Sequence, residues 1–214
     1  MTRLRPALSL VPALVALLGA CQTAAPPPRP RVSVSVEAAE AWRAQATPAD
    51  AELLDTLPTR WNQALEQARA ARLTRRVSAE GALLDPKTAL ARAAPAPGPY
   101  GCRVIRFPAP GTKMRWDQSA NFFCFVGAEA DGPSLTVDGV PQRLGGYLFE
   151  EKGGTRLVFL GAARTRRGAL AAYGDAAGTN AIGMVERIGD FRYRLTVPQR
   201  GGGLAVYEMV ASPR

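Results

Sequence analysis

The sequence predicts an α+β protein in which an N-terminal helical segment packs on a C-terminal antiparallel β-barrel or sandwich of about eight strands. Apolar residues recur with a helical period through residues 47–70, and beyond Pro99 they follow the shorter, Gly-bounded pattern of strands. Of the 214 residues, 47% are hydrophobic and 21% are charged, a composition that can bury a core. The chain divides into a leader (1–20), a proline-rich tether (21–34), a helical segment (35–93) and a barrel domain (99–212), and residues 35–212 are expected to form one folded unit.

The leader has the order of a secretory signal. Two arginines precede an apolar run, residues 7–18, which is too short to span a bilayer as a stable helix and is followed by small residues. The ending Leu18-Gly19-Ala20-Cys21 resembles the lipobox of bacterial lipoproteins, in which the cysteine sulfur is acylated and the chain is cut just before it. Because Gln22 rather than aspartate follows the cysteine, the resemblance implies a lipid anchor on Cys21 in the outer membrane, facing the periplasm.

An alternative for the leader is cleavage after Ala20 by the general signal peptidase, which would leave Cys21 as a free thiol. In both cases the mature protein is expected to be exported. From Gln22 to Pro30 the chain is rich in proline, alanine, threonine and arginine, a composition that favours an extended spacer without a core of its own. Such a tether would hold the folded part away from the membrane.

The three cysteines of the chain fit this scheme. Exported proteins can form disulfides, and three cysteines leave one unpaired, so an acylated Cys21 leaves Cys102 and Cys124 as a pair. These two lie in short apolar segments, residues 100–107 and 121–126, that have the character of core strands. A disulfide between them would fix the centre of the β-rich domain.

Residues 47–70 carry the signals of a helix. Thr47 is a suitable N-cap, Pro48 suits the first helical position, and Asp50 follows three residues after the cap. Because the apolar stripe continues in phase through Pro58, we expect a kink or two abutting helices, the second capped by Thr56. The opposite side is polar, so the stripe should be buried against the rest of the protein. The stripe consists of Leu53, Leu54, Leu57, Trp61, Ala64, Leu65 and Ala68.

Beyond residue 99 the spacing of apolar segments and glycine-containing turns predicts about eight or nine short antiparallel strands. Residues 122–126 and 157–160 are apolar on both faces, so the outside of the sheet should be covered there, and the amphipathic helix is the expected cover. The strands are expected near residues 101–107, 121–127, 134–138, 143–151, 155–161, 169–173, 181–188, 191–197 and 204–210.

The sequence Ile188-Gly189-Asp190-Phe191 predicts a β-hairpin whose two-residue Gly-Asp loop fits a primed turn. In that register Glu186 faces Tyr193 on a side that is otherwise apolar, and Arg194 points to the opposite side. An unpaired carboxylate would be costly in such surroundings. Glu186 therefore needs a partner or a purpose.

Two explanations for Glu186 stay open. As a structural residue it would form a charge-assisted hydrogen bond. The candidate partners are Arg103, Arg143, Arg156 and the Tyr193 hydroxyl. As a functional residue it would make a polar contact inside a ligand-holding barrel. Glu186, Tyr193 and Arg143 are therefore the members of a candidate buried polar site.

The chain contains no histidine. This absence excludes Ser-His-Asp and Cys-His catalysis and the usual histidine-containing zinc sites. The glycines at 201–203 lie between predicted strands rather than before a helix, so they are not a phosphate loop. A pair of carboxylates could support hydrolysis, but the acidic residues of the predicted barrel fall mostly in turns. We therefore predict a protein that is not an enzyme, with no cofactor and no bound metal.

The formal net charge is +9, and without the leader 25 basic and 18 acidic residues still leave +7. A basic protein attracts anionic partners at long range. No run of like charge marks a dedicated patch, so a solvated basic surface is the simpler explanation, and no nucleic-acid partner is expected. The expected partners are the membrane, through the lipid anchor, and a periplasmic protein or anionic envelope component.

Several short segments carry a recognisable pattern. They are Trp61 with Ala64-Leu65 and residues 81–86, 100–105, 142–146, 158–161 and 183–189. Together they resemble the domain-of-unknown-function family numbered 4893, which consists of exported proteins of sphingomonad-type bacteria. Leu83-Leu84-Asp85-Pro86 and Val185-Glu186-Arg187-Ile188-Gly189 are the most distinctive elements. The resemblance covers residues 40–212 and implies export and the extent of the domain, without implying an activity.

The expected function is that of a lipid-anchored, periplasm-facing module that binds a partner or supports the envelope without catalysis. One alternative is a protease inhibitor, because small periplasmic inhibitor barrels with one disulfide are similar in architecture and an acidic protease would attract this basic chain. Another alternative is a hydrolase of an envelope polymer. It would need two carboxyl groups within about 10 Å of each other across an open cleft.

Overall fold

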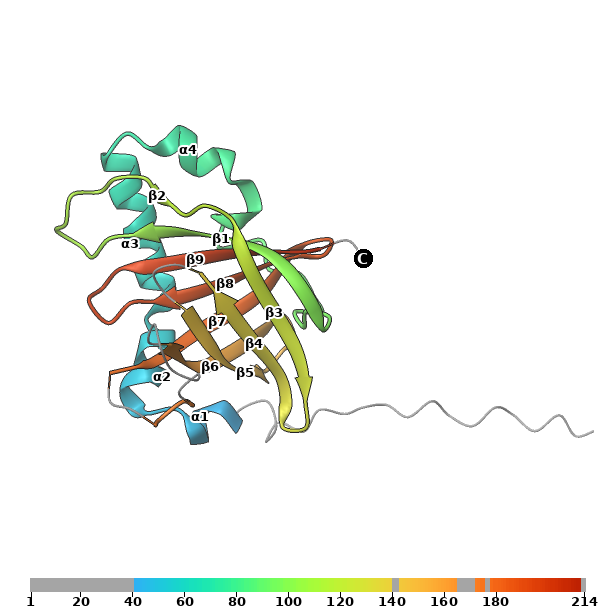
Figure 1. The fold of residues 1–214 in the computed structure, drawn as a ribbon. Helices are drawn as coiled ribbons and strands as arrows, with labels where there is room; N and C mark the ends of the chain where they lie inside the picture. Colours follow the sequence, from blue (N-terminus) through green and yellow to red (C-terminus); the bar gives the residue numbers. More distant parts are fainter. Residues whose placement is uncertain (1–40, 140–142, 165–171, 176–177, 213–214) are drawn as a thin grey trace, which may run out of the picture. The chain divides into compact units, whose positions relative to one another are not determined.

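The fold combines a helical layer with an antiparallel β-barrel, as the sequence predicts (Figure 1). The computed structural model describes residues 41–139, 143–164, 172–175 and 178–212. The leader, the tether with Cys21 and most of the strand predicted near 169–173 lie outside these ranges. No helix within them is long and apolar enough to cross a membrane.

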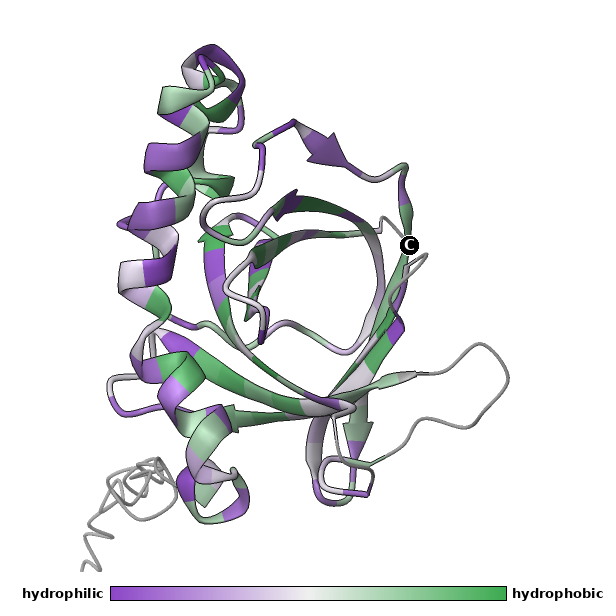
Figure 2. Cartoon of the chain, turned by 90° about the vertical axis from the view of Figure 1, so that its left-hand side faces the viewer, coloured by the Kyte–Doolittle hydropathy of each residue, from purple (hydrophilic) through white to green (hydrophobic). Residues whose placement is uncertain are grey.

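Eight strands close into a barrel by pairing antiparallel with their neighbours in chain order (Figure 2). The ring is completed by the first and last strands, which pair from Tyr100 opposite Ala211 to Phe107 opposite Leu204. The eight strands are β1 (Gly98–Phe107), β3 (Phe122–Glu129), β4 (Gly132–Asp138), β5 (Arg143–Glu150), β6 (Arg156–Arg164), β7 (Asn180–Gly189), β8 (Arg192–Pro198) and β9 (Leu204–Ala211).

A further strand, β2 (Asp117–Gln118), lies outside the closed ring and is absent from the sequence prediction. β1 pairs with β3 from Gly98 to Cys102, and farther along Ile105 and Arg106 pair with β2. A strand of two residues is too short to show a period in the sequence. β1 therefore changes its partner on one side part-way along its length.

The helix start predicted at Thr47 is confirmed. The Asp50 backbone N–H donates to the Thr47 hydroxyl at 3.2 Å, and Pro48 is the first residue of the helix. The break into two abutting helices is confirmed as well. Thr56, between them, does not cap the second helix, since its hydroxyl donates back to the Glu52 carbonyl at 2.9 Å. The elements are α1 (Ala41–Gln45), α2 (Pro48–Asp55), α3 (Leu57–Ala70), α4 (Thr74–Ala79) and the 3-10 turn η2 (Gly81–Leu83).

Two apolar cores hold the fold together. One fills the barrel interior, where Val126, Phe159 and Leu195 are among the fully buried side chains. The other lies between the helices and the outer face of β1, β6, β7 and β9, where Trp61 and Val158 are buried. The predicted burial of the helical stripe is confirmed, and Figure 2 shows α3 running along one side of the ring.

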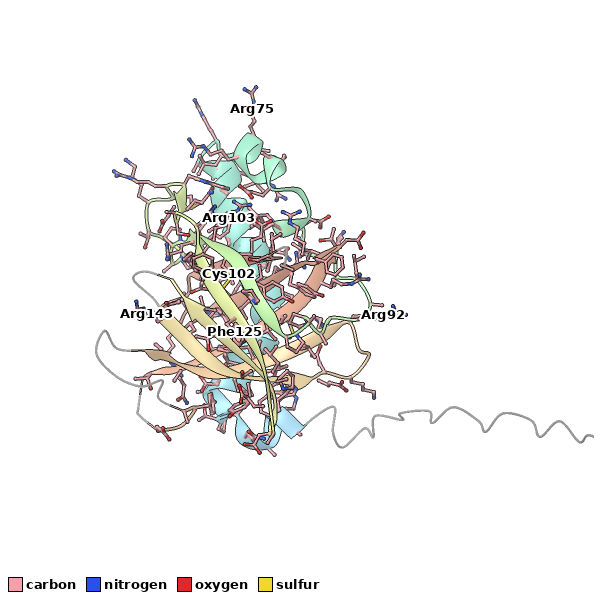
Figure 3. All side chains as sticks on the ribbon, turned by 45° about the vertical axis from the view of Figure 1, so that its right-hand side comes forward. Arg75, Arg92, Cys102, Arg103, Phe125 and Arg143 are labelled. Atoms are coloured by element: carbon pink, nitrogen blue, oxygen red, sulfur yellow. A yellow bond between two sulfur atoms is a disulfide. The ribbon has the colours of Figure 1, made fainter. Side chains whose placement is uncertain are left out.

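The prediction that the helix covers both fully apolar strands is right for one and wrong for the other. In β6, Val158 and Leu160 are buried beneath the helical layer. In β3, Phe123 and Phe125 lie on the outer face and are 72% and 53% exposed. Figure 3 labels Phe125 on this strand. The helices pack on β6, β7, β9 and β1 because outward apolar residues of those strands form one cluster with the apolar stripe of the helices.

The Cys102–Cys124 disulfide is confirmed, and it lies inside the barrel. The two Cα atoms are 6.0 Å apart, and both cysteines are 2% exposed. Cys102 pairs with Phe122 at the last step of the β1–β3 ladder. The disulfide therefore fastens these strands at the point where β1 leaves β3.

Candidate functional site

The β7–β8 hairpin is present, but its predicted register is wrong. The turn consists of residues 190–191 instead of 189–190, and a bulge lies in β7 between Arg187 and Gly189, just before the turn. Glu186 therefore lies opposite Arg194 rather than Tyr193. Glu186 and Arg194 share the outer face of the barrel, whereas Tyr193 belongs to the interior core. Glu186 is buried beneath the helical layer, so it makes no polar contact inside the barrel.

Five charged residues of alternating sign lie in register across the outer face of five neighbouring strands. The row consists of Arg156 on β6, Glu186 on β7, Arg194 on β8, Glu208 on β9 and Arg103 on β1. Opposite charges that face each other across strands attract. Arg194 pairs with Glu186 and Arg103 pairs with Glu208, whereas Arg156, at the end of the row, pairs with Glu151 Oε2 at 2.8 Å.

Arg194 occupies the centre of this row and is 1% exposed. Its Nε donates to Glu186 Oε2 at 2.6 Å. Its Nη1 donates to the carbonyl oxygens of Ala82 and Asp85 at 3.1 and 2.6 Å. Its Cζ lies 4.8 Å from the centre of the Trp61 ring, within the range of a cation–π contact. One guanidinium group thus joins β7, β8, α3, η2 and the residues directly after η2.

The contacts of Arg194 account for two motifs that the sequence singles out. Residues 82–85 supply backbone carbonyl oxygens to the guanidinium group, and the motif at 185–189 supplies the Glu186 carboxylate. The motifs therefore meet at a buried joint between the helical layer and the barrel.

A second set of ion pairs extends the row towards the helices. Glu208 on β9 accepts hydrogen bonds from Arg103 Nε and, at 2.5 Å, from Arg192 Nε. Arg103 also donates to Glu80, directly after α4, at 2.5 Å. The hydrogen bond to Glu80 and the charge of Glu208 raise the pKa of Arg103 against the opposing effect of burial. The network fastens the end of α4 to the barrel.

Tyr193 and Arg143, the other members of the predicted polar site, lie elsewhere. Tyr193 meets Tyr100 edge to face inside the barrel, with ring centres 6.0 Å apart. Burial raises the pKa of both phenols, that of Tyr100 to about 12. Arg143 begins β5 and places its Nε 2.8 Å from Asp138 Oδ1. The structure does not bring Glu186, Tyr193 and Arg143 together.

Asp50 is a buried carboxylate that the sequence indicates only as part of a helix start. It accepts hydrogen bonds from the Tyr173 hydroxyl and from Arg200 Nη2, each at 2.5 Å. Asn180 donates a longer one of 3.3 Å. Burial by itself would raise the pKa of Asp50, but these hydrogen bonds, that of Thr47 and the charge of Arg200 bring it below its usual value. The ionised carboxylate holds α2 to loops at one end of the barrel.

The carboxylates that are buried among the described residues are Asp50, Glu186 and Glu208, and each accepts a hydrogen bond from an arginine. The lowered pKa of Asp50 favours its ionised form and makes it a poor general acid at neutral pH. In the described part of the chain, no three His, Cys, Asp or Glu side chains could together hold a metal ion. The ion pairs of these buried carboxylates connect the helices and loops to the barrel.

A groove with a different charge pattern lies where β1 ends, beside the β8–β9 turn. Its volume is about 440 Å³. Across the described ranges, two of its lining residues, Lys113 and Arg115, make no hydrogen bond or ion pair. The lining consists of Arg106, Phe107, Pro108, Lys113, Arg115, Asp117, Gln199, Leu204 and Ala205.

An apolar pocket of about 600 Å³ lies near the β7–β8 turn, at the other end of the barrel. Its walls include Pro97, Tyr100, Phe191 and Ala211, and none of its lining residues is charged. The Tyr100 hydroxyl already donates to the Ala96 carbonyl at 2.8 Å. The pocket therefore lacks the placed polar groups with which proteins orient a polar ligand.

The sequence interpretation missed Arg194, Glu208 and Asp50 as members of buried networks. A signal was available for two of them. Glu208, like Glu186, is a lone carboxylate within an apolar strand, and Arg194 lies on the strand between them. Two buried carboxylates on alternate strands require a cation in between. Asp50 offered no comparable signal, because its partners other than Thr47 lie more than a hundred residues farther along the chain.

Comparison with known proteins identifies the family. A family model described as "Domain of unknown function (DUF4893)" matches residues 42–209, which include the helical layer, the charged row and the barrel groove. No curated protein and no solved structure matches the chain. The chain therefore belongs to the DUF4893 family, as the resemblance of its motifs implied.

Proposed function

We propose that this protein is an exported, lipid-anchored module that faces the periplasm and binds a component of the cell envelope without catalysing a reaction. The proposal rests on the filled interior of the barrel. Apolar side chains fill its interior, and arginines hold the buried carboxylates. A small barrel filled in this way leaves its outer surface and its loops for binding.

The proposed location draws support from the disulfide and from the leader. Disulfides persist mainly in oxidising compartments, so a buried Cys102–Cys124 bond suits an exported protein. The lipobox-like sequence before Cys21 adds the proposed anchor. The outer membrane is the proposed destination because Gln22 follows the cysteine.

The two alternatives make different demands on the structure. A hydrolase needs two carboxyl groups across an open cleft, whereas, among the described residues, the groove beside β1 has Asp117 as its one acidic lining residue and the apolar pocket has none. A protease inhibitor needs a segment that enters the protease cleft, and the sequence offers residues 22–35, which lie outside the described ranges. The binding module is therefore the function that the described residues favour.

The anchor is tested by replacing Cys21 with alanine in the full-length precursor. Because a thioether requires the cysteine sulfur, we expect Cys21→Ala to abolish incorporation of labelled palmitate and to shift the protein from the membrane pellet to the soluble envelope fraction. Gln22→Ala, which keeps the cysteine, should still be labelled. A wild-type protein that is unlabelled, or a Cys21→Ala variant that remains labelled, would show that Cys21 is not the acylation site.

Binding without catalysis is tested with the soluble Cys21→Ala protein and isolated cell envelopes. We expect the protein to sediment with the envelopes while no sugar or peptide fragments enter the supernatant, even after long incubation. Time-dependent release of fragments would replace the proposal with the hydrolase. Failure to sediment with envelopes would rule out a binding role for the folded domain.

A further inference from the structure

The groove beside β1 contains positive charge that the protein itself does not neutralise. Arg106 projects from β1, and Lys113 and Arg115 come from the loop between β1 and β2. Asp117 is the acidic residue in the lining. Its Oδ1 is 3.5 Å from Arg106 Nη1, and its side chain is 57% exposed. Three cations therefore face one weakly engaged carboxylate.

The arginines of the charged row on the outer face of the barrel are paired with carboxylates, unlike Lys113 and Arg115 in the groove, among the described residues. In that row Arg103 and Arg194, and beside it Arg192, each lie 2.6 Å or less from a carboxylate oxygen. Lys113 and Arg115, within the part of the chain that the structure describes, have no such partner. Their donors are available to an external anion.

The loop that carries these two side chains is held in place. Gln67 on α3 donates to the Ala109 carbonyl at 3.4 Å, and the Thr112 N–H donates to the same carbonyl at 3.1 Å. On the other flank the Trp116 ring lies 5.9 Å from the guanidinium carbon of Arg76 on α4. An anchored loop loses less conformational freedom when a ligand binds. The contact with Arg76 also extends the positive region towards α4.

The base of the groove is apolar. Phe107, Leu204 and Ala205 contribute to it, and each is 3% exposed or less. A groove that joins an apolar base to a cationic rim matches a ligand with an anionic group attached to a less polar body. Phosphate suits the rim, because lysine and arginine both bind it and the guanidinium group can do so through two donors.

We infer that this groove binds a phosphate-bearing group of the cell envelope, with Lys113 and Arg115 as the main contacts and Arg106 behind them. The inference rests on the proposed function and names the ligand class of that envelope-binding module. A phospholipid headgroup and a soluble phosphate share this chemistry.

The test compares two double variants in the Cys21→Ala background, each of which removes two positive charges. Lys113→Gln with Arg115→Gln alters the groove, and Lys152→Gln with Arg92→Gln is the matched control. The control residues are exposed and lie in the β5–β6 turn and in the connection before β1, near the other end of the barrel. Far-UV circular dichroism and thermal unfolding should be unchanged in both variants, because all four side chains are exposed.

Binding is measured by sedimentation with phosphatidylcholine vesicles that contain, or lack, phosphatidylglycerol. Each basic residue near an anionic surface contributes about a fivefold factor, so the groove variant should bind the anionic vesicles about 30-fold more weakly. The control variant should stay within about twofold of the parent. An equal loss in both variants, or no loss in the groove variant, would overturn the inference.

Inorganic phosphate distinguishes the two sources of the ligand. Competition between millimolar phosphate and the vesicles, at constant ionic strength and with sulfate as the control anion, would support a site for the phosphate group itself. Vesicle binding that resists phosphate but requires Lys113 and Arg115 would support a lipid headgroup. Absence of binding to vesicles and to phosphate would overturn the inference. The proposed function would still stand if the groove variant sedimented with isolated envelopes as well as the parent does.

Discussion

Replacing Arg194 with methionine is expected to lower the free energy of unfolding by about 3–5 kcal/mol. The substitution leaves the buried Glu186 carboxylate without the Nε donor that lies 2.6 Å away. It also removes the donor to the carbonyl oxygens of Ala82 and Asp85. Urea denaturation followed by tryptophan fluorescence measures the loss, and Trp61, against which the guanidinium group packs, reports on the site.

A matched double variant separates the pair from its surroundings. Arg194→Met combined with Glu186→Leu removes both charges, so no unpaired buried carboxylate remains, and much of the lost stability should return. Glu186→Gln alone should cost less than Arg194→Met, because the amide oxygen can still accept from Nε. A loss below about 1 kcal/mol in Arg194→Met would mean that Arg194 does not join the helical layer to the barrel.

Removal of the disulfide is expected to cost about 3 kcal/mol, because the bond closes a loop across a sequence separation of 22 residues and so restricts the unfolded chain. The double variant Cys102→Ala with Cys124→Ala avoids leaving a buried thiol or hydroxyl in the barrel interior. The measurement is the urea midpoint of the variant against the oxidised parent. The difference should be larger than that produced by a single exposed substitution such as Arg92→Gln.

The reduced parent protein is the control for cavity effects. Adding a phosphine reductant during unfolding should shift the parent to the midpoint of the double variant and leave the variant unaffected. Thiol titration establishes that reduction is complete. If the fully reduced parent unfolded at the same urea concentration as the oxidised protein, the disulfide would contribute nothing to stability.

Features that depend on short-range pattern could be predicted from the sequence. The start of α2 at Thr47, the break before α3 and the positions of eight barrel strands follow from caps, prolines and periodicity. The disulfide followed from the number of cysteines and their place in apolar strands. Each of these inferences needs only a few neighbouring residues.

Features that depend on register or on distant partners could not be predicted in this way. The hairpin sequence is compatible with turns at 189–190 and at 190–191, and the observed bulge decides which side Glu186 faces. Likewise, the composition of β3 does not reveal that the helices pack on other strands and leave Phe123 and Phe125 exposed. The groove residues Lys113 and Arg115 fall in a connection without periodicity, so no pattern distinguishes them from solvated basic residues.

The pairing of β1 with β9 has a consequence for the order of assembly. β1 can form its ladder with β3 early, because the two strands are close in the chain, and the cysteines can then secure that ladder. The other side of β1 has no neighbour until the final strand is available. Such a distant contact is slow to form. A protein that ended before β9 would not be a smaller barrel but an open sheet, with two exposed borders that invite association between chains.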